Sequence, residues 1–153
     1  MKISHKLFAI LTMVVLVAIL LTSPAGAETI SVPMDIDGVR IFVVVLVNDK
    51  RARLLLDTGA GITLVEPQFA KGTRELQSVF TQQLAGFSQA SIRRVSLTLG
   101  ELTLKDVLVG VLDMTDVKKR AAMDMNGMLG EDVLCRFRSV RINFKNKTLE
   151  LER

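Results

Sequence analysis

The chain has 153 residues, which is the length of about one domain, and it carries 20 Lys and Arg against 16 Asp and Glu. It contains no Trp or Tyr, so basic residues are not interleaved with stacking aromatics and nucleic acid is not an expected partner. A single cysteine, Cys135, excludes a disulfide within the chain.

Residues 1–27 are typical of a secretory signal peptide. Two lysines precede an apolar run from Leu7 to Leu21, and Ala25-Gly26-Ala27 supplies the small residues that signal peptidases recognise. The run is shorter than the roughly 20 residues that span a bilayer, so we expect cleavage and export to the periplasm or the medium. An uncleaved membrane anchor is the alternative. Cleavage would remove two lysines and no acidic residue, which lowers the net charge from +4 to +2.

The predicted mature domain, residues 28–153, contains no histidine, because His5 lies in the leader. This excludes a serine triad, a Cys-His pair and the usual zinc sites. We expect neither a metal ion nor another cofactor, and we expect Cys135 to be a small packed residue.

Alternation of apolar and polar residues, separated by turn residues, predicts a mainly β domain. Val95, Leu97 and Leu99 are expected to point inward. A short helix is expected over 66–71, a loop over 72–77, a surface loop or helical turn over 113–124, and a helix over 131–138. Strands are expected over 30–36, 41–47, 52–56, 62–65, 78–84, 88–95, 95–99, 102–104, 107–112, 140–144 and 148–151.

One acidic residue stands at a tight turn between two apolar segments. Leu54-Leu55-Leu56 leads into Asp57, and Ile62 to Val65 continue after Gly59 and Gly61. The glycines permit a backbone path that residues with a Cβ resist, and the turn should direct Asp57 out of the core. A plain hairpin turn is the alternative, since Asp and Gly are favoured in turns for local reasons.

A second informative segment follows near the end of the chain. Gly127 and Gly130 bracket Met128 and Leu129, and acidic residues directly afterwards suit the positive end of a helix.

The segment Leu55-Leu56-Asp57-Thr58-Gly59-Ala60, followed later by Gly127 to Gly130 opening a helix, resembles the single-domain retropepsin-like aspartic proteases of the exported bacterial type. The resemblance implies an acid-protease barrel with a flap hairpin and one short C-terminal helix. It also implies an aspartic endopeptidase that acts on peptides or proteins.

The resemblance further implies a homodimer, because hydrolysis needs two carboxylates that share a proton and this chain offers one Asp-Thr-Gly. Asp57 of each chain would then be catalytic. Thr58 would form a hydrogen bond across the dimer, Gly59 would let the backbone approach the substrate, and Ala60 would line the cleft.

Two further groups of residues take roles by the same resemblance. Met128, Leu129 and Gly130 would pack beside the active-site loop and hold it rigid. Ala85, Gly86 and Phe87 would form the tip of the flap, which closes over an extended peptide; an ordinary solvent-facing hairpin is the alternative.

The sequence departs from the family pattern at Gly61, where Ser, Thr or Asp is usual. A hydroxyl or carboxylate that would brace the loop is therefore missing. This departure, and a flap sequence without a specific signature, motivate an alternative function: a peptide-binding or assembly module that keeps the barrel and has lost turnover.

Overall fold

The computed structural model describes residues 28–83 and 86–153, so the predicted leader lies outside the described residues. The chain is mainly β, as predicted. Its strands are β1 (Thr29–Asp37), β2 (Arg40–Val47), β3 (Lys50–Leu56), β4 (Leu64–Val65), β5 (Glu75–Gln83), β6 (Gly86–Leu99), β7 (Leu102–Val111), β8 (Gly127–Leu129), β9 (Ser139–Asn143) and β10 (Thr148–Glu152). The helices are short: η1 (Pro67–Phe69, a 3-10 turn), α2 (Thr115–Ala121) and α3 (Glu131–Leu134).

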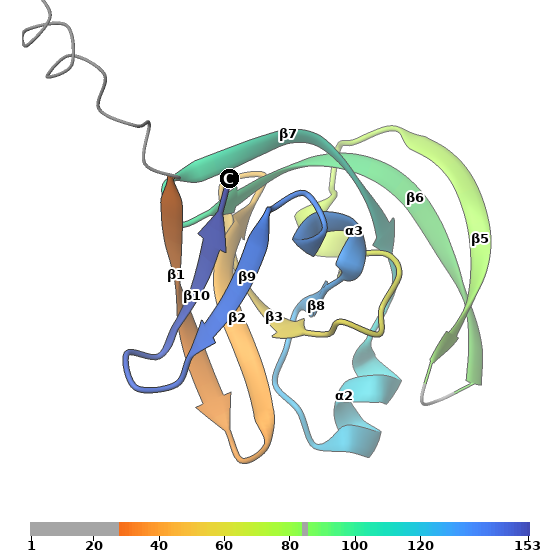
Figure 1. Ribbon diagram of the computed structural model, residues 1–153. Helices are drawn as coiled ribbons and strands as arrows, with labels where there is room; N and C mark the ends of the chain where they lie inside the picture. Colours follow the sequence, from red (N-terminus) through yellow and green to blue (C-terminus); the bar gives the residue numbers. More distant parts are fainter. Residues whose placement is uncertain (1–27, 84–85) are drawn as a thin grey trace, which may run out of the picture.

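Six strands close into a barrel (Figure 1). Their order is β6-β7-β4-β8-β3-β2, and β2 returns to β6 through the pairs Leu46 with Thr98 and Val47 with Leu97. Strand β1 continues from β2 and carries β10 and then β9 beyond the barrel. Among the described residues, no helix is long and apolar enough to cross a membrane.

The barrel interior is filled by inward residues of alternating strands. In β1, Ile30, Val32 and Met34 are buried while their neighbours are exposed, which is the period-two pattern of a half-buried strand. The inward positions predicted at Val95, Leu97 and Leu99 are confirmed, because all three are 3% exposed or less. A second apolar cluster lies under α2 and is rich in methionine; it includes Phe42, Leu64, Met114, Val117, Met123, Met125 and Met128.

Several predicted boundaries were wrong. Strand β5 begins at Glu75, inside the segment 72–77 that was expected to be a loop. Its polar residues form a strand because their backbone pairs with β6 while their side chains face solvent. The segments expected as separate strands over 88–95 and 95–99 form one long strand, with an irregularity between Val95 and Leu97. Likewise, 102–104 and 107–112 merge into β7.

The two helical regions also differ from expectation. Helix α3 ends at Leu134, four residues before the predicted end, because the Arg138 amide donates a hydrogen bond to the Glu152 carbonyl and starts the β9–β10 ladder. The segment over 113–124 contains a true helix, α2.

Candidate active site

The acidic turn lies where two strands are held together by a third. Strand β8 pairs in parallel with β3, with Leu56 opposite Leu129, and antiparallel with β4, with Leu64 opposite Met128. The chain therefore leaves β3, makes the loop 57–63, and returns as β4 on the other side of β8. A loop whose two ends are fixed to the same strand has little freedom to move.

Local hydrogen bonds orient the Asp57 carboxylate at the mouth of this loop. The Asp57 amide donates to the Leu129 carbonyl at 3.1 Å, and the Ala60 amide donates to the Asp57 carbonyl at 3.2 Å. The Gly59 amide donates to Asp57 Oδ1 at 2.9 Å. Asp57 is half-buried and Gly59 is exposed, so the carboxylate is held in place and still reaches solvent.

A buried hydroxyl ties the loop to α3. Thr63 is fully buried, and both its amide and its Oγ1 donate to Asp132 Oδ1 at 2.8 Å. The same Oγ1 accepts a hydrogen bond from the Gly130 amide at 3.0 Å. Sequence reasoning missed this brace. The available signal was Thr63 itself, since a hydroxyl within an apolar segment must find a partner when it is buried.

Two glycines let β8 approach the loop closely. A Cβ at Gly130 would lie 2.7 Å from the Ala60 carbonyl oxygen and 2.9 Å from the Thr63 amide nitrogen. A Cβ at Gly127 would collide with the Leu64 carbonyl oxygen. The Glu131 amide completes the contact by donating to the Ala60 carbonyl at 2.8 Å. A larger residue at Gly130 would push the loop away from this segment, and a larger residue at Gly127 would push β4 away from β8.

The structure brings most of the residues singled out from the sequence to one place. Asp57, Thr58, Gly59 and Ala60 form the loop, with Thr58 exposed and Ala60 half-buried. The other group, Met128, Leu129 and Gly130, lies buried against it.

The flap residues are placed differently. Ala85 lies outside the described residues, while Gly86 and Phe87 are the first residues of β6 and pair with Gln83 and Gln82. Gly86 and Phe87 therefore belong to the ladder between β5 and β6.

Gly61 is exposed, and a Cβ there would meet no atom within 4 Å. The brace that the sequence departure at Gly61 seemed to remove is supplied two residues later, by Thr63 and Asp132.

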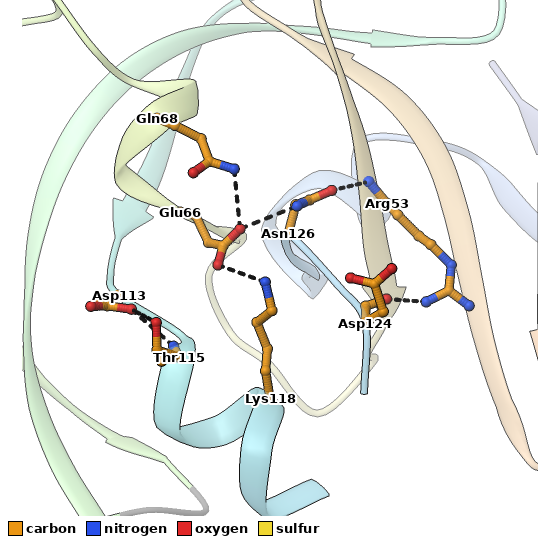
Figure 2. A network of polar contacts seen from close by, with 8 residues as sticks. All are labelled: Arg53, Glu66, Gln68, Asp113, Thr115, Lys118, Asp124 and Asn126. Atoms are coloured by element: carbon orange, nitrogen blue, oxygen red, sulfur yellow. Dashed lines mark hydrogen bonds and ion pairs between the residues drawn. The ribbon is translucent and has the colours of Figure 1, made fainter. Parts of the chain in front are cut away.

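The buried carboxylate of Glu66, directly after β4, fixes α2 to the barrel (Figure 2). Glu66 is 8% exposed and accepts hydrogen bonds from Lys118 at 3.0 Å, Asn126 at 3.1 Å and Gln68 at 3.3 Å. Asn126 in turn accepts from the Arg53 amide at 3.0 Å. The network joins β3, β4 and α2, and its charge is compensated by Lys118.

Replacing Lys118 by Met should lower the free energy of unfolding by about 1–2 kcal/mol, because Glu66 would lose its cation while it stays buried. Lys119→Met is the matched control, since Lys119 is exposed on the same helix, and it should change stability by less than about 0.5 kcal/mol. Urea unfolding measures both values. Equal stabilities of the two variants would contradict a stabilising role of the ion pair between Lys118 and Glu66.

At the start of α2, Asp113 accepts hydrogen bonds from the Thr115 hydroxyl at 2.6 Å and the Thr115 amide at 2.9 Å. These bonds lower the pKa of the Asp113 carboxyl below its ordinary value, the side-chain bond contributing most. The contribution of these bonds to the stability of the folded chain is therefore fully present above pH about 3.8, the ordinary pKa of an Asp carboxyl. It is lost as the pH falls further and Asp113 becomes protonated in the folded chain.

Cys135 is not the packed residue that the sequence suggested. It follows α3 as an exposed, free thiol, and its Sγ lies 3.6 Å from Glu131 Oε1. Partial desolvation raises the pKa of this thiol, and the charge of Glu131 and its hydrogen bond raise it further. The thiol is therefore less acidic than an ordinary cysteine. In the described part of the chain, no cluster of three His, Cys, Asp or Glu side chains could hold a metal ion.

Comparisons with known proteins bear on this site. Residues 43–133 match the protein family described as Aspartyl protease, a segment that includes both the loop and β8. A retropepsin-like aspartic protease from Rickettsia conorii superposes with a TM-score of 0.55 at 20% identity, over 82% of this chain and 91% of that protein. EIAV protease, in complex with the inhibitor HBY-793, superposes with a TM-score of 0.51 at 21% identity, over 67% and 93% of the two chains. No curated protein sequence matches the chain.

Proposed function

The chain belongs to the aspartyl protease family and has a retropepsin-like fold, and from this premise we propose that it is an aspartic endopeptidase whose active site combines Asp57 of two identical chains. The observation that carries the proposal is the half-buried carboxylate of Asp57 on a loop fixed to β8 and α3. A positioned carboxylate of this kind is what acid-base activation of water requires.

The chemistry needs a second carboxylate. When two carboxylates face each other, like-charge repulsion separates their apparent pKa values, so that one is ionised and one is protonated over a range of acidic pH. The ionised group takes a proton from the attacking water. The protonated group donates a hydrogen bond to the scissile carbonyl oxygen. Two-fold symmetry supplies such a pair from one Asp57 in each chain.

The remaining elements fit the binding of an extended peptide. The hairpin of β5 and β6 projects from the barrel and curves away from it (Figure 1). We place it over the substrate, where strand-type backbone hydrogen bonds give affinity with little dependence on sequence. In the same proposal, the leader exports the domain, and residues 28–153 act in the periplasm or outside the cell.

The proposal is tested with the purified mature chain, residues 28–153, and an unfolded protein substrate from mildly acidic to neutral pH. We expect new internal amino termini, with a rate per chain that rises with chain concentration because the dimer is the active form. The expected pH profile is bell-shaped. A chain that dimerises and cleaves nothing would instead support the peptide-binding module.

A further inference from the structure

We propose that the open pocket at the base of the β5–β6 hairpin binds a lysine or arginine side chain of an extended polypeptide, at a distance from the bond that is cut. The inference rests on the proposed function, because it names a feature of the substrate and the surface that selects it. It is carried by the lining of the pocket, by the charge of Asp113 and by the outer edge of β5.

The pocket has a volume of about 370 Å³ and lies on one face of β5, β6 and β7, where Ser91 pairs directly with Val111. Pro67 of η1 lines it as well, and residues 57–60 are not part of its lining. Val111 and Leu112 are buried and close its floor. Pockets that bind small ligands have volumes of about 300–1,000 Å³, so this one has room for a long side chain.

The positive charge in this pocket is already used within the chain. Arg93 donates through Nε to Ser91 Oγ at 3.1 Å, through Nη1 to the Thr73 carbonyl at 2.7 Å and through Nη2 to Glu75 at 3.4 Å. The Ser78 hydroxyl donates to the other Glu75 oxygen at 2.6 Å. Because all three side-chain nitrogens of Arg93 donate and Glu75 balances its charge, the pocket does not favour an anion.

The charge that remains in the pocket is that of Asp113. Its Oδ1 accepts both hydrogen bonds from Thr115 (Figure 2), which leaves Oδ2 for a ligand. Within residues 28–83 and 86–153, Asp113 forms no ion pair. The nearby Lys118 pairs with Glu66 instead, at 3.0 Å. The pocket is therefore complementary to a cation.

The lining suits a side chain with an apolar stem and a cationic end. Three oxygen acceptors line the pocket: Oδ2 of Asp113, the amide oxygen of Gln89 and the hydroxyl of Ser91. A lysine ammonium has three donors and no acceptor, and an arginine guanidinium also only donates. The methylene stem of either residue packs on apolar surface while its charged end stays near water, and Pro67 and Leu112 supply that surface.

The position of β5 favours a polypeptide over a free amine. Strand β5 is the first in the order of the sheet, and in the described part of the chain it pairs with β6 alone. Its outer edge therefore offers backbone groups with which an extended chain can pair. Glu75 and Ser78 of this strand line the pocket, so a chain paired with β5 would place alternate side chains on the face that contains it.

Fluorescence anisotropy tests the pocket without reference to hydrolysis. The protein is the mature chain with Asp57→Asn, and the probe is a labelled serine- and threonine-rich peptide with one lysine, compared with the same peptide with glutamine in its place. We expect the lysine peptide to bind about three- to fivefold more tightly. Asp113→Asn should remove this preference. Asp116→Asn is the matched control and should keep it, because Asp116 is exposed in the first turn of α2 and does not line the pocket.

Gln89→Ala is a second variant that leaves the hydrogen bonds at the start of α2 intact, and it should also reduce the preference. Circular dichroism checks that each variant is folded. Equal affinities of the two peptides, a preference that survives Asp113→Asn, or a preference that Asp116→Asn also removes would each overturn the proposal. Butylamine that binds as tightly as the lysine peptide would show a site for free amines and would overturn the polypeptide ligand.

Cleavage of an unfolded protein separates this inference from the proposed enzyme. We expect lysine or arginine to recur at one fixed distance from the cleaved bonds. Asp113→Asn should raise KM about three- to fivefold and leave kcat unchanged, because the pocket holds the substrate away from the reacting atoms. Lysine-dependent binding without any cleavage would uphold the pocket and remove the enzyme. Cleavage without lysine-dependent binding would uphold the enzyme and overturn the pocket.

Discussion

Replacing Asp57 by Asn is expected to reduce peptide-bond hydrolysis by about 10³-fold while the chain keeps its fold and its self-association. Asn can still accept the hydrogen bond from the Gly59 amide through its side-chain oxygen, so the loop geometry should persist. It cannot become an anion, however, and a dyad with two amides has no group that takes a proton from water. The measurement is the rate of cleavage of an unfolded protein substrate at the pH optimum of the wild type.

Asp37→Asn is a suitable control for this prediction. Asp37 is an exposed carboxylate at the end of β1, and it takes no part in the loop. Its replacement should leave the rate within about twofold of the wild type. Equal rates for Asp57→Asn and the wild type would show that the observed cleavage does not depend on this carboxylate.

Replacing Asp132 by Ala should lower the free energy of unfolding by about 2–4 kcal/mol, because one carboxylate oxygen accepts both hydrogen bonds that Thr63 donates. Without it, a buried amide and a buried hydroxyl lose their acceptor, although the hydroxyl still receives the Gly130 amide. Chemical denaturation gives the value, and hydrolysis should fall in parallel because the loop is less rigid.

Two neighbouring substitutions separate this brace from a general effect on α3. Asp132→Asn retains an acceptor oxygen and should cost less than the alanine variant. Glu131→Ala, at the exposed position one residue earlier, should change stability by less than about 0.5 kcal/mol. If Glu131→Ala destabilised the chain as much as Asp132→Ala, the Thr63 brace would not explain the loss.

The parts of the fold that depend on local pattern could be predicted from the sequence. Strict alternation placed Val95, Leu97 and Leu99 inside the barrel, and the apolar segments around Asp57 placed a loop between two buried strands. In both cases, one short segment contains the physical cause. The position of Met128, Leu129 and Gly130 beside the loop was implied by the family resemblance and not by the local pattern, and the structure shows that Gly130 lies close to the Ala60 carbonyl.

Features that depend on distant partners could not be read in this way. Thr63 and Asp132 are 69 positions apart, and nothing near either residue indicates the other. Glu75 lies in a polar segment and becomes a strand because β6 pairs with it. Helix α2 was obscured because its charged surface residues outnumber its buried one, Val117. Cys135 was expected to be packed, but α3 ends before it and leaves it on the surface.

The shared active site is tested by mixing wild-type and Asp57→Asn chains in equal amounts, at a fixed total concentration well above the dissociation constant. If each active site takes one Asp57 from each of two chains, only dimers of two wild-type chains hydrolyse the substrate. The mixture should then retain about a quarter of the activity of the same total amount of wild type. Retention of about half would mean that each chain carries a complete site by itself, and would contradict the shared dyad.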